Sequence, residues 1–180
     1  MKAKEFFTAK RIAMIAVFAA LTTVATIVIA IPISSGAGFV NVGDTVIFLC
    51  AALMDPISAL LVGGLGSAIG DLLLGYAAYA PFTLVVKGLE GLVAALLIKL
   101  MRKKIVFALN YIVAFTAGGV CMTAGYCFTA DLILYGWAAA VASVPANLIQ
   151  AAVSIVIATA LAAVLGNMKV VRDFMPKTGG

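Results

Sequence analysis

The sequence predicts an all-α integral membrane protein, a bundle of six transmembrane helices with both termini in the cytoplasm and a single domain over residues 1–180. The first reason is composition, because 65% of the residues are apolar, 11% are charged and the mean hydropathy is +1.23. A soluble domain is about half apolar and a quarter charged. The second reason is a series of long apolar segments, and the third is a one-sided distribution of basic residues.

Six apolar segments, separated by proline, glycine, serine or charged clusters, take up most of the chain. A helix needs about 20 apolar residues to cross a membrane. The second segment has only about 12 residues and reaches about 18 Å, so it cannot cross unaided. We expect part of the preceding linker, Pro32–Val42, to dip into the protein, which is possible where backbone lines a cavity. The segments are Ala9–Ile33, Gly43–Met54, Pro56–Gly75, Pro81–Met101, Ile105–Leu134 and Trp137–Asn167.

Eleven of the twelve basic residues fall into three groups: before the first segment, between the fourth and fifth, and after the sixth. With six crossings all three groups lie on one side of the membrane, and the positive-inside rule makes that side cytoplasmic. The net charge of +5 then reflects topology and attraction to the lipid bilayer, not nucleic-acid binding. The groups are Lys2, Lys4, Lys10 and Arg11; Lys99, Arg102, Lys103 and Lys104; and Lys169, Arg172 and Lys177.

Lys87 is the one basic residue inside a long apolar segment. A charge there costs roughly 2.5–3.5 kcal/mol unless it is paired or faces water, so it marks a candidate functional site. Asp71, at comparable depth on the neighbouring helix, and Glu90, one turn along the same helix, are both available as partners. Two interpretations stay open: a closed ionic network that fixes helix register, or a polar substrate site in a cavity.

Further polar and aromatic side chains are expected at the same end of the bundle. Asn147 and Gln150, one turn apart, must face the interior, either as contacts between helices or as ligands of a substrate. Asp131 is expected to be solvated near its helix end. The aromatic candidates for stacking a small ring are Tyr76, Tyr79, Phe82 and Tyr126, whereas Tyr135 and Trp137 are expected to lie in the interfacial aromatic belt.

Two stripes of small residues suit close helix packing. The first, Ala9, Ala13, Ala16 and Ala20, is either an internal contact or a docking face for another subunit. The second, Gly63, Gly66, Ser67 and Gly70, is expected to pack within the chain.

Several types of site are missing from the sequence. It has no histidine, no phosphate-binding GxxxxGK[ST] loop, and no HExxH or GxSxG motif. The three cysteines lie in apolar surroundings without metal-binding spacing. We therefore expect no enzyme, no catalytic residue, no metal site and no cofactor in this chain, with energy supplied by another protein.

A combination of motifs resembles a known family. The stretch Asn41–Leu97 contains NVGD, GGLGSAIGDLLLGY and APFTLVVKGLEG, and PANLIQ follows at 145–150. Together with the alanine stripe, these resemble the S components, the substrate-binding membrane subunits, of energy-coupling factor (ECF) vitamin transporters. They are most similar to the branch for hydroxymethylpyrimidine or pyridoxine uptake. One departure is Asp55-Pro56, where relatives usually have Gly-Pro.

The resemblance implies a high-affinity subunit for importing a small heteroaromatic vitamin across the bacterial plasma membrane. It implies a partner module of one transmembrane coupling subunit and two cytoplasmic ATPases, which bind the ATP, with the alanine stripe as docking face. The S component would topple in the membrane to release its vitamin. The substrate-binding candidates are Asn41 and Asp44 in a first-loop lid, Tyr76 and Tyr79 in the third loop, and Thr83, Lys87, Glu90, Tyr126, Asn147 and Gln150 in or near the pocket.

The residues leave other functions open. A self-sufficient channel or exporter would use the small-residue stripes to form a homo-oligomer. Within the family, riboflavin and thiamine uptake are weaker alternatives, because no pattern typical of those branches is present.

Overall fold

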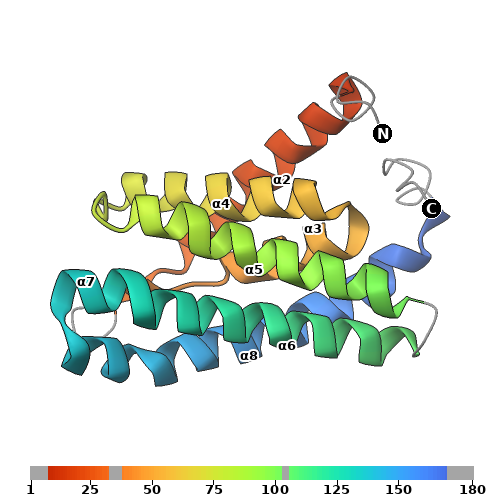
Figure 1. The fold of residues 1–180 in the computed structure, drawn as a ribbon. Coiled ribbons are helices and arrows are strands. Elements are labelled where there is room, and N and C mark those ends of the chain that lie inside the picture. Colours follow the sequence, from red (N-terminus) through yellow and green to blue (C-terminus); the bar gives the residue numbers. More distant parts are fainter. Residues whose placement is uncertain (1–7, 33–37, 103–105, 170–180) are drawn as a thin grey trace.

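The computed structural model describes residues 8–32, 38–102 and 106–169 as a bundle of long helices (Figure 1). Six helical rods follow one another along the chain, as the sequence predicts. They are α2 (Ala9–Val28), α3 (Gly43–Leu53), α4 (Pro56–Leu73), α5 (Ala80–Met101), the continuous rod α6 (Phe107–Tyr126), η1 (Cys127–Asp131) and α7 (Leu132–Tyr135), and α8 (Trp137–Asn167).

The first rod ends at Val28, earlier than the predicted Ile33. Ile31 and Pro32 form a short strand, β1 (Ile31–Pro32), which pairs antiparallel with β2 (Phe39–Val40). Proline disfavours helical backbone in the residue before it, which explains why the helix stops short of this position.

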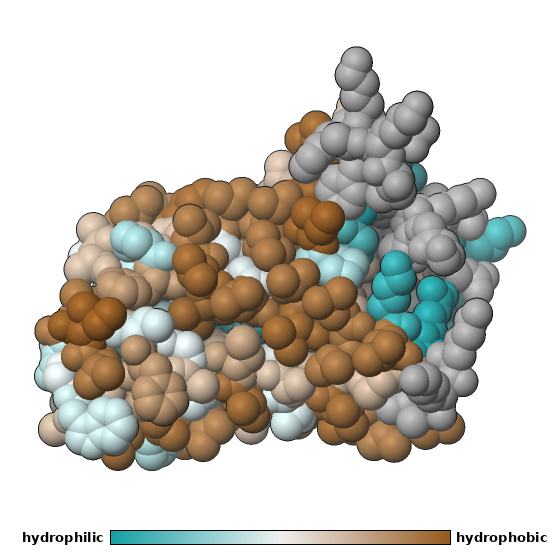
Figure 2. Space-filling view, viewed as in Figure 1, coloured by the Kyte–Doolittle hydropathy of each residue, from teal (hydrophilic) through white to brown (hydrophobic). Residues whose placement is uncertain are grey.

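The outer surface of the molecule suits a lipid environment. Four helices are long and apolar enough to cross a membrane: Ala9–Val28, Pro56–Leu73, Ala108–Tyr135 and Trp137–Asn167. Large apolar side chains such as Leu73 and Ile149 are 67% and 65% exposed, and the face drawn in Figure 2 is mostly hydrophobic. Continuous apolar surface of this kind is rare on soluble monomers and is satisfied by contact with lipid.

The short helix α3 lies inside the bundle, in contact with α2, α4, α5 and α8. Ile47, Phe48 and Cys50 are fully buried, and the Phe48 ring stacks on Phe115 of α6 at 4.7 Å between centroids. Because longer helices surround it, α3 need not span the full thickness of the membrane by itself. It begins at Gly43, directly after the segment that carries Gly38 and Phe39 into the protein, as expected for the described part of the linker.

Glycines on α4 bring its neighbours into close contact, which confirms that this small-residue stripe packs internally. A Cβ at Gly63 would collide with the backbone carbonyl of Lys87 in α5, and one at Gly66 would lie 2.7 Å from the carbonyl of Ala19 in α2. α4 therefore sits between α2 and α5 and fixes the height of Lys87 in the bundle.

The start of α2, the end of α5, the start of α6 and the end of α8 lie at the same end of the bundle (Figure 1). Of the basic residues, Lys10, Arg11, Lys99, Arg102 and Lys169 fall within the described ranges and belong to these ends, whereas Lys2, Lys4, Lys103, Lys104, Arg172 and Lys177 lie outside them. Arg11 is buried, pairs with Asp55 and donates to the Ser58 hydroxyl. Asp55 also caps α4, so this pair joins the start of α2 to the α3–α4 turn.

Candidate functional site

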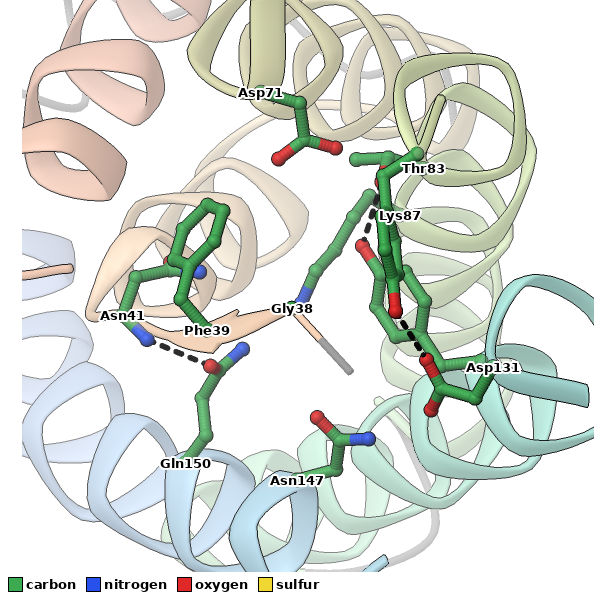
Figure 3. Close-up of a pocket in the computed structure, with 11 residues that line it drawn as sticks. Gly38, Phe39, Asn41, Asp71, Thr83, Lys87, Asp131, Asn147 and Gln150 are labelled. Carbon is green, nitrogen blue, oxygen red and sulfur yellow. Dashed lines mark hydrogen bonds between the residues drawn. The ribbon is translucent and has the colours of Figure 1, made fainter. Parts of the chain in front are cut away.

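A cavity of about 30 Å³ lies near the other end of the bundle, enclosed by α4, α5, α6 with η1, α8 and the segment before α3 (Figure 3). This volume holds about two water molecules. The lining residues are Gly38, Phe39, Asn41, Asp71, Tyr79, Thr83, Lys87, Tyr126, Asp131, Asn147 and Gln150.

Lys87 reaches the cavity from α5 and is 2% exposed. Its ammonium donates a hydrogen bond to Asp44 Oδ1 and lies 3.0 Å from Glu90 Oε2. It also lies 5.7 Å from the centroid of the Tyr126 ring, a cation–π contact. The predicted pairing with Glu90 is confirmed, but the second partner is Asp44 in the first turn of α3. Asp71 makes no ion pair with Lys87.

Gln150 connects α8 to the start of α3 and the residues just before it, more than 100 residues earlier in the sequence. Its amide nitrogen donates to Asp44 Oδ2 at 2.7 Å, and its amide oxygen accepts from the backbone N–H of Asn41 at 2.7 Å. The Asn41 side chain in turn accepts from the N–H of Gly43 at 2.8 Å, where α3 begins. The start of α3 and the segment before it are thereby attached to α8.

Asp131 is almost fully buried at 1% exposure, so the expectation that it is solvated was wrong. Tyr79 donates to its Oδ1 at 2.8 Å and Ser143 donates to its Oδ2 at 2.5 Å. Asp131 closes η1, a π-helical turn of a kind often found at functional sites. The cost of a charge in an apolar segment, the argument that singled out Lys87, also applies to Asp131 and would have identified it.

Tyr79, directly before the first residue of α5, is the centre of an aromatic cluster. Its ring is 6.2 Å from Tyr76, 6.4 Å from Tyr126 and 6.0 Å from Tyr135, centroid to centroid. Burial and the neighbouring Asp131 raise the pKa of Tyr79, which keeps its hydroxyl protonated as a donor. Tyr135 is about half exposed, as a belt residue would be, although it also contacts this cluster.

The Tyr126 hydroxyl lies 3.0 Å from the Thr83 hydroxyl, and either oxygen can donate to the other. This contact joins α6 to α5 at the cavity, on the side where Asp71 of α4 also lines it.

The structure brings most of the predicted residues together. Asn41, Tyr79, Thr83, Lys87, Tyr126, Asn147 and Gln150 all line the cavity. Asp44 and Glu90 do not line the cavity but pair with Lys87, which does. Tyr76 is likewise not in the lining, but its ring contacts two lining residues, Phe39 and Tyr79. Phe82, a predicted stacking residue, is partly buried and does not line the cavity. Gly38, Phe39 and Asp131 were missed. Asp71, for which pairing with Lys87 and contact with a substrate were both left open, lines the cavity.

Two side chains of the lining keep unused hydrogen-bonding capacity. Asn147 is 6% exposed, and its amide makes no hydrogen bond with any described residue. Asp71 is 5% exposed, and its Oδ2 has no partner within the described ranges. Both point into the open space in Figure 3. Buried polar groups without partners are rare in folded proteins, so these two are suited to hold a guest.

The alanine stripe lies on the free face of α2. Ala9, Ala13, Ala16 and Ala20 are all exposed, whereas Met14, Ile15, Ala19 and Thr22 on the opposite face are buried. The internal-packing interpretation of this stripe therefore does not hold within the described part of the chain.

Known proteins resemble the chain over nearly its whole length. The family model described as "ECF-type riboflavin transporter, S component" matches residues 6–167. An "Uncharacterized protein in gap 3'region" of Pyrococcus woesei is 36% identical over 146 residues, 79% of this chain and 93% of the relative. The "Thiamine precursor transporter HmpT" of Lactococcus lactis subsp. cremoris (strain MG1363) is 27% identical over 175 residues, 97% of this chain and 98% of the relative. This protein therefore belongs to the family of ECF-type riboflavin transporter S components.

Proposed function

We propose that this protein is the substrate-binding subunit of an importer for a small heteroaromatic vitamin or vitamin precursor, with hydroxymethylpyrimidine as first candidate and a pyridoxine-like ring as second. The observation that carries the proposal is the cavity beside Lys87, where Asp71 Oδ2 has no partner among the described residues and the Asn147 amide is directed into the open space (Figure 3). Tyrosine rings provide flat faces against which an aromatic ring can stack.

The size of the cavity favours a single ring over riboflavin. At about 30 Å³ the lining must move apart for any ring to enter. Phe39 and Asn41 lie on the segment before α3, which is held by one hydrogen bond from Gln150, by pairing of β2 with β1 and by the contact of Phe39 with Tyr76, so entry of a ring requires these contacts to shift. Riboflavin, with three fused rings and a sugar-alcohol chain, needs a much larger displacement. The similarity to HmpT also favours a thiamine precursor.

The proposal includes an energising module. A transmembrane coupling subunit would dock on the exposed alanines of α2, and two cytoplasmic ATPases would bind and hydrolyse ATP. Toppling of the loaded S component would deliver the vitamin into the cell. The family match favours this assembly over a self-sufficient channel.

The test is ligand binding by the purified chain in detergent. Native mass spectrometry should detect a retained ligand of about 140–170 Da, a size that a small pocket can enclose. Isothermal titration with hydroxymethylpyrimidine, pyridoxine, riboflavin and thiamine should then give the tightest binding for one of the first two. Binding of riboflavin alone would refute the substrate assignment, and binding of none would refute the proposed function.

A further inference from the structure

The cavity has an excess of acidic side chains. Four of the seven acidic residues in the chain, Asp44, Asp71, Glu90 and Asp131, gather at it, compared with one of the twelve basic residues, Lys87. Lys87 forms its ion pairs with Asp44 and Glu90. Within the described ranges, the two aspartates on the opposite wall have no ion pair of their own.

Those two aspartates differ in how they are satisfied. Asp131 accepts from Tyr79 and Ser143, so both its oxygens have donors. The Oδ2 of Asp71 has no partner among the described residues, and it belongs to a side chain that is 95% buried. Figure 3 shows its carboxylate directed into the cavity, across from Asn147. A buried carboxylate oxygen in this state calls for a donor from outside the protein.

The rest of the lining is also suited to positive charge. Tyr79 and Tyr126 turn aromatic rings toward this region, and Tyr126 already lies close to one ammonium group. The faces of aromatic rings attract cations, most strongly where water is excluded. Carboxylates accept shorter and stronger hydrogen bonds from charged N–H donors than from neutral ones.

We infer that the cavity takes an amino-substituted nitrogen heterocycle in its cationic form, with the N–H edge of the ring on Asp71 Oδ2 and the amide of Asn147 on another polar substituent. The inference rests on the proposed function, since it specifies the charge of the ring that this site holds. A neutral ring that offers only acceptors to Asp71 would leave this carboxylate oxygen unsatisfied.

The experiment compares two rings of nearly equal size by isothermal titration of the full chain at neutral pH. One is 4-amino-5-hydroxymethyl-2-methylpyrimidine, and the other is its 4-oxo counterpart, which is not basic and carries a carbonyl in place of the amino group, so its remaining ring N–H is a neutral donor. The unchanged protein should bind the amino ring at least about 10-fold more tightly, as expected for a charge-assisted hydrogen bond. Asp71→Asn should remove most of this preference by weakening binding of the amino ring.

Asp55→Asn is the matched control, because Asp55 lies at the other end of the bundle and should leave both affinities unchanged. Equal affinity for the two rings, or a full preference retained by a folded Asp71→Asn variant, would overturn the inference and leave the proposed function standing. Failure of both rings to bind the unchanged protein would instead overturn the proposed function. If Asp71→Asn does not fold, the comparison of the two rings on the unchanged protein decides alone.

Discussion

Lys87 is placed for both of the roles that the sequence left open. It closes an ionic network, because Asp44 of α3 and Glu90 of its own helix surround the ammonium. It also lines the cavity, where a guest could reach it. A buried ion pair contributes little net stability, but the loss of one partner leaves an uncompensated charge. The structural contribution of Lys87 and the proposed binding contribution must therefore be measured separately.

Replacing Lys87 with alanine should lower the free energy of unfolding by about 3–5 kcal/mol, because Asp44 and Glu90 lose their only described cation. Thermal unfolding in detergent measures this effect. The double variant Lys87→Gln/Glu90→Gln, which removes one charge of each sign, should recover much of the loss. If the single variant were as stable as the unchanged protein, the network would not be needed for folding.

Asn147→Ala should weaken binding of the vitamin roughly 2- to 12-fold, the value of one ordinary hydrogen bond. The melting temperature should stay unchanged, because the Asn147 amide makes no hydrogen bond to the described part of the protein. Gln150→Ala is the comparison, since Gln150 holds both Asn41 and Asp44 and its loss should lower stability as well as affinity. A fall in stability with unchanged affinity for Asn147→Ala would remove it from the site.

At the scale of the element, α2 presents two different faces. One packs on α4, where Gly66 and Gly70 admit the backbone and the threonines of α2. The other carries the exposed alanines. A stripe without large side chains allows another helix to approach closely in lipid, where packing rather than hydrophobic burial drives association.

Ala13→Trp or Ala16→Trp should abolish uptake in cells that contain the energising module, while binding by the purified subunit stays unchanged. The indole would hold a docking helix away from α2, but it would not reach the cavity, which α2 does not line. Radiolabelled uptake and isothermal titration provide the two measurements. Val113→Trp, at a 41% exposed position on α6, is the control of equal bulk. Full uptake by both alanine variants would move the docking face elsewhere.

At the scale of the whole molecule, the sequence predicts the helices well because hydropathy and breakers act locally. The first and last residues of the helix Trp137–Asn167 are predicted correctly, and Pro56 and Gly43 each begin a helix as expected. Side-chain partners are harder to predict, because they depend on which faces of distant helices meet. Asp44 lies 43 residues from Lys87, and helical depth alone does not distinguish it from Asp71. Asp131 is buried only because Tyr79 and Ser143 converge on it.

The orientation of the bundle can be predicted from the basic residues at one of its ends. Lys99 and Arg102 belong to the end where α2 begins and α8 ends, whereas the α4–α5 connection at Ala78 lies at the end near the cavity. From the positive-inside rule we expect Arg102 to face the cytoplasm and the cavity to face the outside. The proposed import of a vitamin needs this orientation, because its substrate arrives from outside.

A membrane-impermeant maleimide should therefore label Ala78→Cys but not Arg102→Cys in intact cells, and both after permeabilisation, since both positions are exposed. The background protein should carry Cys50→Ala, Cys121→Ala and Cys127→Ala, which removes three free thiols that are buried or partly buried. Labelling of Arg102→Cys alone in intact cells would invert the bundle. The cavity would then face the cytoplasm, and export would become the direction that the structure supports.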